Sequence, residues 1–322
     1  MRGVWVEGGR VTLRDDLPVP SPPAGWALVA VECAGVCGTD LQILDGYADF
    51  TGILGHEFAG RVVVGSPQWQ GRRVVGEINV GCGHCTRCAA DEPTHCADRR
   101  VLGIRGLNGA LAEFVVLPER NLHCIPADLS SEDASFAEPL AAAFRVLEQV
   151  EIPAASRALV VGAGRLGQLV ARALRAGGHA VDALGGKTSK AERLLHCGVR
   201  LVDDVAAAYD LAIDCSGSAT GFERACAALR PGGTLVLKST VQSPLAVRTD
   251  TLVVNELRVV GSRCGPFAPA LEALRGGTVR VDDLVDGRYV LAEAEEALRM
   301  AAAPGVIKVL VTADVSGDCL PE

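Results

Sequence analysis

The sequence has no excess of positive charge, because its formal net charge at pH 7 is −8. An acidic chain does not favour nucleic acid or an anionic membrane surface as a partner. No apolar run approaches the ~18 residues of a membrane-spanning helix, and residues 1–16 lack the apolar segment of a signal peptide. Aromatic residues make up only 4% of the chain, which gives no sign of a large stacking pocket. We therefore expect a cytoplasmic protein without a nucleic-acid or membrane partner.

The most distinctive motif is a group of four cysteines, Cys82, Cys85, Cys88 and Cys96, within the lobe at about residues 80–100. In a reducing compartment, clustered cysteines bind metal more often than they form disulfides. Four thiolates close a tetrahedral shell, which is typical of structural zinc. An iron–sulfur cluster is the chemical alternative, but nothing else in the sequence indicates electron transfer. We predict a structural zinc site.

The length of 322 residues suits about two domains. Residues 1–137 contain short apolar runs separated by turn signals, which predicts a β-rich domain. Residues 138–265 alternate short buried strands with helices, which predicts a doubly wound parallel sheet. Residues 266–322 contain two helical stretches and end in an apolar strand, which we expect to return to the first domain. The predicted fold class is α/β.

A glycine-rich turn lies between a predicted strand and a predicted helix. The segment VVGAGRLG supplies Gly162, Gly164 and Gly167 around Arg165 and Leu166. Such glycines allow a tight turn, a close approach to a pyrophosphate and close packing of the helix on the strand. The helix N-terminus then offers free N–H groups to the phosphates. The motif predicts dinucleotide binding.

The choice of cofactor is read at the end of the next strand, where an acidic residue would bind the ribose of NAD. The expected strand end places Gly185 or the following glycine there, with Lys187 and Lys190 just beyond. A 2′-phosphate would be accepted and attracted, so NADP(H) is favoured over NAD(H). The alternative is that the strand ends three residues earlier and that Asp182 binds the ribose.

A second candidate metal set is dispersed along the chain. Cys37, His56, Glu57 and Glu138 are the residue types of an open zinc site, in which three protein ligands leave one position for substrate. Taken singly, each residue is weak evidence, because a lone cysteine in an apolar strand usually belongs to the core.

Together the motifs resemble those of the zinc-dependent medium-chain dehydrogenase/reductase family, in its alcohol, polyol and threonine dehydrogenase branches. The matching segments occur in the family's order and are GVCGTD, GHEFAG, the four-cysteine lobe, FAEPLA and VVGAGRLG. The resemblance covers nearly the whole chain. It implies a GroES-like catalytic domain, a Rossmann cofactor domain, two zinc ions per chain and assembly as a homodimer or homotetramer.

The resemblance also implies roles for individual residues. Cys37 and His56 would bind the catalytic zinc, Glu138 is the favoured third ligand, and the adjacent Glu57 could enter the shell. Thr39 would take the proton of the alcohol.

Further positions follow from the same resemblance. Asp40 would orient His56. Lys308 would lie near the cofactor pyrophosphate. Four residues would flank the nicotinamide: Ser239, Thr240, Ser262 and Arg263. Gln42 departs from the family pattern, because many members have a histidine there at the outer end of the proton relay.

The predicted function is zinc-dependent hydride transfer between a secondary alcohol, polyol, sugar or aminocyclitol and a nicotinamide cofactor. Two other functions remain open. One is a zinc-free reductase of the same fold that acts on enones or quinones. The other is a non-catalytic NADPH sensor.

Overall fold

The computed structural model describes residues 1–153, 156–185, 188–240 and 246–313. The chain forms two compact units, Met1–Glu138 with Arg280–Glu322, and Pro139–Val279. The second unit extends beyond the predicted boundary at residue 266. Helix α9 (Phe267–Arg275) belongs to it and buries Phe267, Leu271 and Leu274. The chain returns to the first unit at Arg280.

The first unit is built from three β-sheets. The largest contains β3, β5, β6, β10, β11, β18 and β19, at Trp26–Gly35, Glu57–Val64, Arg73–Gly76, Phe114–Pro118, Leu122–Cys124, Val285–Val290 and Lys308–Thr312. The second contains β1 (Gly3–Glu7), β2 (Arg10–Arg14) and β4 (Gly52–Ile53), and the third contains β7 (Asn79–Val80), β8 (Arg100–Leu102) and β9 (Gly106–Leu107). The last strand pairs with β3, where Val311 lies opposite Ala34. The C-terminal segment thus completes the N-terminal sheet.

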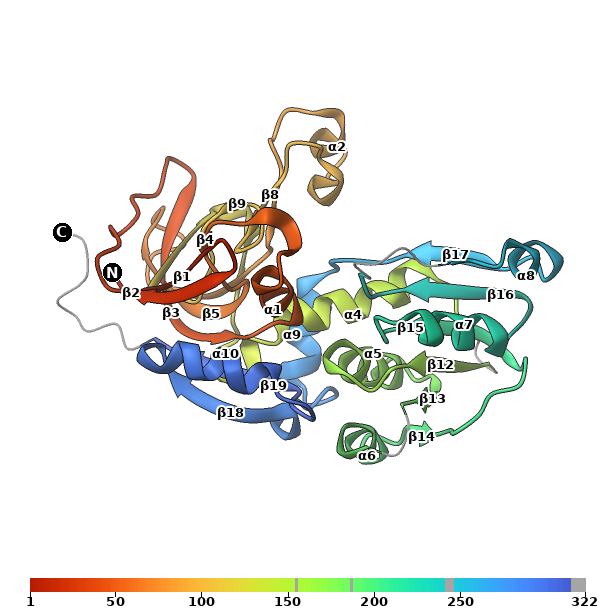
Figure 1. The fold of residues 1–322 in the computed structure, drawn as a ribbon. Helices are drawn as coiled ribbons and strands as arrows, with labels where there is room; N and C mark the ends of the chain where they lie inside the picture. The colour runs from red at the N-terminus through yellow and green to blue at the C-terminus, as the bar shows by residue number, and fades with distance from the viewer. Residues whose placement is uncertain (154–155, 186–187, 241–245, 314–322) are drawn as a thin grey trace. The chain divides into compact units, whose positions relative to one another are not determined.

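The helices of the first unit are short (Figure 1). The α-helices are α1 (Gly38–Leu44), α2 (Thr86–Ala89), α3 (Ser131–Ala134) and α10 (Ala294–Ala302). The 3-10 helices are η1 (Tyr47–Asp49), η2 (Pro93–His95), η3 (Glu119–Asn121), η4 (Asp282–Leu284) and η5 (Leu291–Glu293). Most of this unit's regular structure is therefore strand, as the run of short apolar segments predicts.

The second unit is a parallel sheet in the order β14-β13-β12-β15-β16-β17. Its strands are β12 (Arg157–Val161), β13 (Ala180–Leu184), β14 (Arg200–Leu201), β15 (Tyr209–Asp214), β16 (Leu229–Leu237) and β17 (Arg258–Gly261). Its further helices are α4 (Ala137–Gln149), which begins in the first unit, and α5 (Arg165–Ala176), α6 (Ser189–Leu195), α7 (Ala219–Ala228) and α8 (Thr249–Val254). The strand order reverses between β12 and β15, and doubly wound sheets bind dinucleotides at that point.

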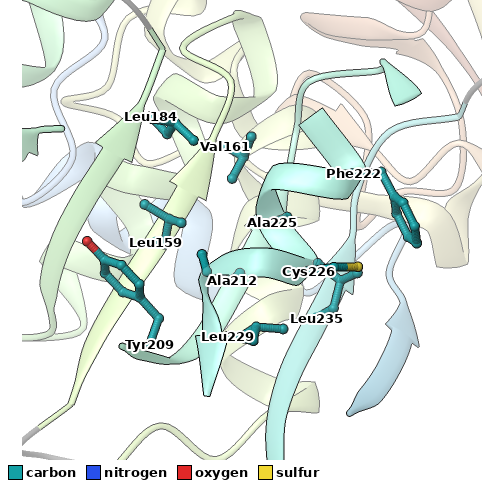
Figure 2. Packing of buried hydrophobic residues seen from close by; sticks show 11 residues of the cluster. Leu159, Val161, Leu184, Tyr209, Ala212, Phe222, Ala225, Cys226, Leu229 and Leu235 are labelled. Atoms are coloured by element: carbon teal, nitrogen blue, oxygen red, sulfur yellow. The ribbon is translucent and has the colours of Figure 1, made fainter. Parts of the chain in front are cut away.

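The core of this sheet is apolar and closely packed. Figure 2 shows Phe222, Ala225 and Cys226 of α7 beside Leu159 of β12 and Leu235 of β16. Each of these side chains is at most 8% exposed. Burial on this scale stabilises the unit by roughly 1.5–3 kcal/mol for each large aliphatic or aromatic side chain. No helix in the described part of the chain is both long and apolar enough to cross a membrane.

Candidate functional site

The pairing of two strands brings the dispersed metal candidates together. Gly35, at the end of β3, lies opposite Glu57, at the start of β5. The residues that follow β3 therefore lie beside those that precede β5. Cys37 is the N-cap of α1 and has an extended backbone with φ −93° and ψ 157°, and His56 is the residue before β5.

Cys37, His56 and Glu57 form one cluster. The cysteine sulfur, a histidine ring nitrogen and a carboxylate oxygen all lie within 4.8 Å of one another. His56 and Glu57 are 3% and 2% exposed. One thiolate, one imidazole and one carboxylate are a donor set that suits an open zinc site. The cluster therefore fits the predicted catalytic zinc.

Asp40 contacts this cluster through both oxygens of its carboxylate. Its side chain is fully buried, and one oxygen accepts a hydrogen bond of 2.8 Å from the backbone N–H of Cys37. Its other oxygen accepts one of 3.3 Å from the N–H of Gly55 and lies 3.3 Å from His56 Nδ1. With Nδ1 turned towards Asp40, Nε2 is the ring nitrogen left for a metal.

The cluster creates a negative field. Burial alone lowers the pKa of His56, but the charges of Asp40 and Cys37 outweigh burial and raise this pKa well above its ordinary value. The same field attracts a divalent cation. The electrostatics and the donor types therefore agree on a metal site.

Lys308 pairs with Glu57, and both side chains are almost completely buried. The Lys308 ammonium also lies over the ring of Phe136, 5.2 Å from its centroid. Gly35 permits this arrangement, because a Cβ at that position would lie 2.4 Å from a Glu57 oxygen. In the described structure, Lys308 thus holds the carboxylate of the metal cluster. The contact with a cofactor pyrophosphate that the resemblance implies stays a prediction.

Glu138 does not join this cluster. It lies in the first turn of α4, and its carboxylate is not among the atoms within 4.8 Å of one another. Of the two carboxylates that the sequence offers, the structure places Glu57 with Cys37 and His56. A role for Glu138 as third ligand stays a prediction.

Thr39 and Gln42 lie on α1, directly after Cys37, and both are half-buried. A hydroxyl two residues from the candidate ligand is close in the chain to the site where substrate would bind. Further along the chain towards His56, Phe50 is buried and Tyr47 is half-buried. Two residues between them, Ala48 and Asp49, have positive φ angles of 69° and 43°.

The four-cysteine lobe forms the second cluster. The sulfurs of Cys82, Cys85, Cys88 and Cys96 lie within 4.8 Å of one another. Backbone N–H groups point at these sulfurs. The N–H of Cys88 is the main cause that lowers the pKa of Cys85 to about 7, and that of His84 is the main cause that lowers the pKa of Cys82. Four clustered sulfurs, of which the loop's own N–H groups favour two as thiolates, fit a closed structural zinc site.

The glycine turn of the second unit has the expected geometry. Gly162 has a φ of +100°, and its N–H donates to Leu184 O over 2.8 Å. A Cβ at Gly167 would lie 1.9 Å from Gly162 O, whereas one at Gly164 would meet nothing within 4 Å. Gly167 is therefore needed for packing. Gly164 leaves the open approach that a phosphate group requires.

The end of β13 lies where the sequence places it. The strand ends at Leu184, and Gly185 follows. Asp182 lies inside the strand, fully buried, and its carboxylate accepts hydrogen bonds from Arg157, Arg200 and the Tyr209 hydroxyl. This carboxylate is already committed to three partners. Lys187, which the sequence also assigns to the cofactor site, lies outside the described residues.

Sequence reasoning missed Lys238. This lysine follows β16 and is 8% exposed. Its ammonium donates hydrogen bonds to Ala142 O (2.6 Å), Ser262 Oγ (3.2 Å) and Arg263 O (2.8 Å). Lys238 therefore supports the two residues predicted beside the nicotinamide. A lysine at the end of an otherwise apolar strand was the available signal. Ser239 and Thr240 follow it and are half-buried and exposed.

A β-rich unit with two clusters of metal-binding side chains, together with a parallel-sheet dinucleotide unit, is the architecture of a zinc-binding dehydrogenase. Residues 23–127 match the alcohol dehydrogenase GroES-like domain, and residues 166–275 match the zinc-binding dehydrogenase family. The chain belongs to the zinc-dependent medium-chain dehydrogenase family and is an oxidoreductase. The predicted family and fold class are confirmed.

Curated relatives and solved structures match most of the length of the chain. A sorbitol dehydrogenase of Halalkalibacterium halodurans is 26% identical and is matched over 92% of this chain and 94% of its own. An erythritol/L-threitol dehydrogenase of Mycolicibacterium smegmatis is 27% identical over 94% of each chain. The crystal structure of a zinc-binding dehydrogenase of Sinorhizobium meliloti 1021 bound to NADP is 28% identical, with a TM-score of 0.89 over 97% of this chain and 98% of that one.

Proposed function

We propose that this protein transfers a hydride between a secondary alcohol or polyol, including sugars and aminocyclitols, and a nicotinamide cofactor, with zinc at the Cys37–His56–Glu57 cluster. The observation that carries the proposal is this buried donor set, supported by Asp40 and Lys308. The names of the two relatives, a sorbitol and an erythritol/L-threitol dehydrogenase, favour polyols as the substrate class.

When bound, zinc supplies a Lewis acid that lowers the pKa of an alcohol, and the nicotinamide supplies the hydride acceptor. The chain supplies the geometry. Cys37 and His56 would hold the metal through one sulfur and Nε2, while Asp40 keeps the imidazole turned. Thr39 is the hydroxyl that accepts the alcohol proton. Gln42 cannot act as a base at neutral pH. The proton therefore leaves Thr39 by a route that does not include Gln42.

NADP(H) is the cofactor that the second unit favours. Gly185 stands where an NAD-binding protein would have an acid, and Asp182 is held by its own partners. The relative from Sinorhizobium meliloti was solved bound to NADP. We also propose that the four-cysteine lobe binds a second, structural zinc ion.

The deciding experiment combines zinc analysis with turnover. We expect two zinc ions per chain, and oxidation of polyols with NADP+ at a higher kcat/KM than with NAD+. One zinc per chain, together with reduction of enones or quinones, would instead establish the zinc-free reductase. Binding of NADPH without turnover over a panel of polyols, amino sugars and ketones would establish the sensor.

A homodimer or homotetramer is also part of the proposal. The edge strand β17 has three exposed residues among its four, and the adjacent α8 exposes Val253 and Val254 at 73% and 79%. An uncovered edge with apolar neighbours is a surface on which a second copy can pair. Sedimentation of the wild type and of Val254→Lys tests this, because a monomeric wild type would remove the proposal.

A further inference from the structure

The glycine turn has two links to the region that is predicted to select the cofactor. One is a direct contact with the end of β13, and the other is made through Gln168 to the start of α6. At the near end, Gly162 N–H donates to Leu184 O, and Gly185 lies so close to the turn that a Cβ would be 2.6 Å from the Ala163 Cβ. Replacing Gly185 with an acid would therefore force the turn to move. Gly185, which is predicted to select the cofactor, therefore packs directly against the turn that is predicted to bind the pyrophosphate.

The second link is Gln168, near the start of α5. Its side chain is fully buried. Its amide nitrogen donates to Ala163 O over 3.1 Å and to Lys190 O over 2.5 Å. Both partners are carbonyl oxygens, so the NH₂ group must face them and the orientation of the amide is unambiguous.

The two partners of Gln168 belong to the two halves of the predicted adenosine site. Ala163 lies inside the glycine turn, whereas Lys190 lies in the first turn of α6. Thr188 caps this helix by accepting a hydrogen bond of 3.2 Å from Ala191 N–H, and Ala191 is completely buried. The start of α6 is thus fixed, and Gln168 sets its distance from the turn.

The buried amide of Gln168 carries an energetic penalty. Within the described part of the chain, the Gln168 Oε1 is buried and accepts no hydrogen bond. A buried amide oxygen without a donor is unfavourable, because it loses its hydrogen bonds to water and gains none in the fold. An apolar side chain would avoid this penalty and would still fill the space. The retained amide is therefore explained by what its two N–H groups hold together.

We propose that Gln168 is a positioning residue for cofactor selection, which holds the glycine turn at Ala163 and the start of α6 at Lys190 at the spacing that NADP(H) requires. This inference rests on the proposed NADP(H) preference and deepens it. Gln168 acts through Ala163 and Lys190 and need not touch the cofactor.

The test uses Gln168→Met, which keeps an unbranched side chain of similar volume and removes both donors. The probes are 2′,5′-ADP, which carries both phosphate groups, and 5′-AMP, which lacks the 2′-phosphate. Since a net hydrogen bond contributes about 1 kcal/mol, which is about fivefold in an equilibrium constant, we expect the Kd for 2′,5′-ADP to rise about 5-fold and that for 5′-AMP to rise less than about 2-fold. In turnover, the KM for NADP(H) should rise while kcat is kept.

The chain provides a matched control. Gln149 is another glutamine of the second unit whose amide nitrogen donates to one carbonyl, that of Gly261, and whose buried oxygen has no described donor. Gln149→Met should leave both Kd values unchanged. If Gln168→Met does not fold, Gln168→Asn keeps a neutral amide that is too short to reach both carbonyls and should raise the Kd for 2′,5′-ADP in the same direction.

The outcomes separate the two proposals. A wild type that binds 2′,5′-ADP and 5′-AMP equally would overturn the NADP(H) preference and this inference with it. A wild type that prefers 2′,5′-ADP, with a Gln168→Met variant that keeps the same ratio of Kd values, would overturn only the positioning role.

Discussion

The two metal clusters of the first unit differ in how the chain builds them. The four cysteines of the lobe lie within fifteen residues and are mostly half-buried. Cys37 and the His56–Glu57 pair are separated by 19 positions and are brought together by the pairing of β3 with β5. The first cluster is local, whereas the second depends on the fold.

The supporting contacts differ as well. In the lobe, backbone N–H groups of the same loop favour the thiolates. In the buried cluster, Asp40 of α1 faces His56, which lies before β5, and Lys308 of the last strand holds Glu57. A site for chemistry needs an open ligand position, and side chains outside the ligand set must then keep the remaining ligands in place. A closed site needs only its loop.

Removing a ligand from the buried cluster should have the largest effect. We expect Cys37→Ala to lower the zinc content from two ions to one per chain and kcat/KM by about a thousandfold or more, because the Lewis acid is lost. The unfolding temperature should change little. Zinc analysis and steady-state turnover on a polyol are the measurements.

Cys33 provides the control for this variant. It lies four residues earlier, in β3, and burial raises the pKa of its thiol to about 12. Such a thiol stays protonated and does not bind metal. Cys33→Ala should keep two zinc ions and near-normal turnover. If Cys37→Ala behaves in the same way, Cys37 is a core residue and the catalytic assignment is lost.

Asp40 tests the support of the same cluster. Its carboxylate binds the Cys37 backbone and faces His56. Asp40→Asn should weaken zinc retention and lower activity about 10–100-fold, as loss of such a partner of a metal ligand does. Asp45→Asn, at the exposed end of α1, is the comparison. Equal activity of the two variants would mean that Asp40 only caps the helix.

The lobe should respond in the opposite way. Cys85→Ser removes one of four thiolates, so we expect one zinc ion to be lost and the unfolding temperature to fall, because structural zinc stabilises its own loop. Turnover per folded molecule should stay within about tenfold of the wild type, since the open site is untouched. Loss of turnover comparable to that of Cys37→Ala would mean that the lobe takes part in catalysis.

These differences explain how much could be predicted from the sequence. The lobe, the glycine turn and the end of β13 at Leu184 are local patterns, and each lies where the sequence places it. The partners of Lys308 could not be predicted, because the pairing of β19 with β3 brings them together from positions far apart. The predicted end of the second domain at residue 265 was wrong for a similar reason. Helix α9 resembles any amphipathic helix, and only its packing shows to which unit it belongs.

Asp182 provides a buried carboxylate without a metal cluster, for comparison with Asp40. Burial alone would raise the pKa of Asp182, but the hydrogen bonds from Arg200 and Tyr209 and the charge of Arg157 outweigh it and lower this pKa. Asp182→Asn should destabilise the protein by roughly 2 kcal/mol at pH 7, because charge-assisted hydrogen bonds are lost and both arginines stay partly solvated. Urea unfolding measures this difference.

The pH dependence of that difference follows from the direction of the shift. A carboxylate whose pKa is lower in the folded state stabilises the protein above its unfolded pKa, about 3.9, and loses this contribution as the pH falls through the folded value. The stability difference between wild type and Asp182→Asn should be constant from pH 7 to 5 and shrink below about pH 4. Asp210→Asn, which breaks the exposed pair with Arg230, should cost less than about 1 kcal/mol. Because Asp182 is held inside the strand, its variant should also keep the KM for NAD(H). A higher KM for NAD(H) would show that Asp182 reaches the ribose after all, and the buried carboxylates of the two units would then share a role in ligand binding.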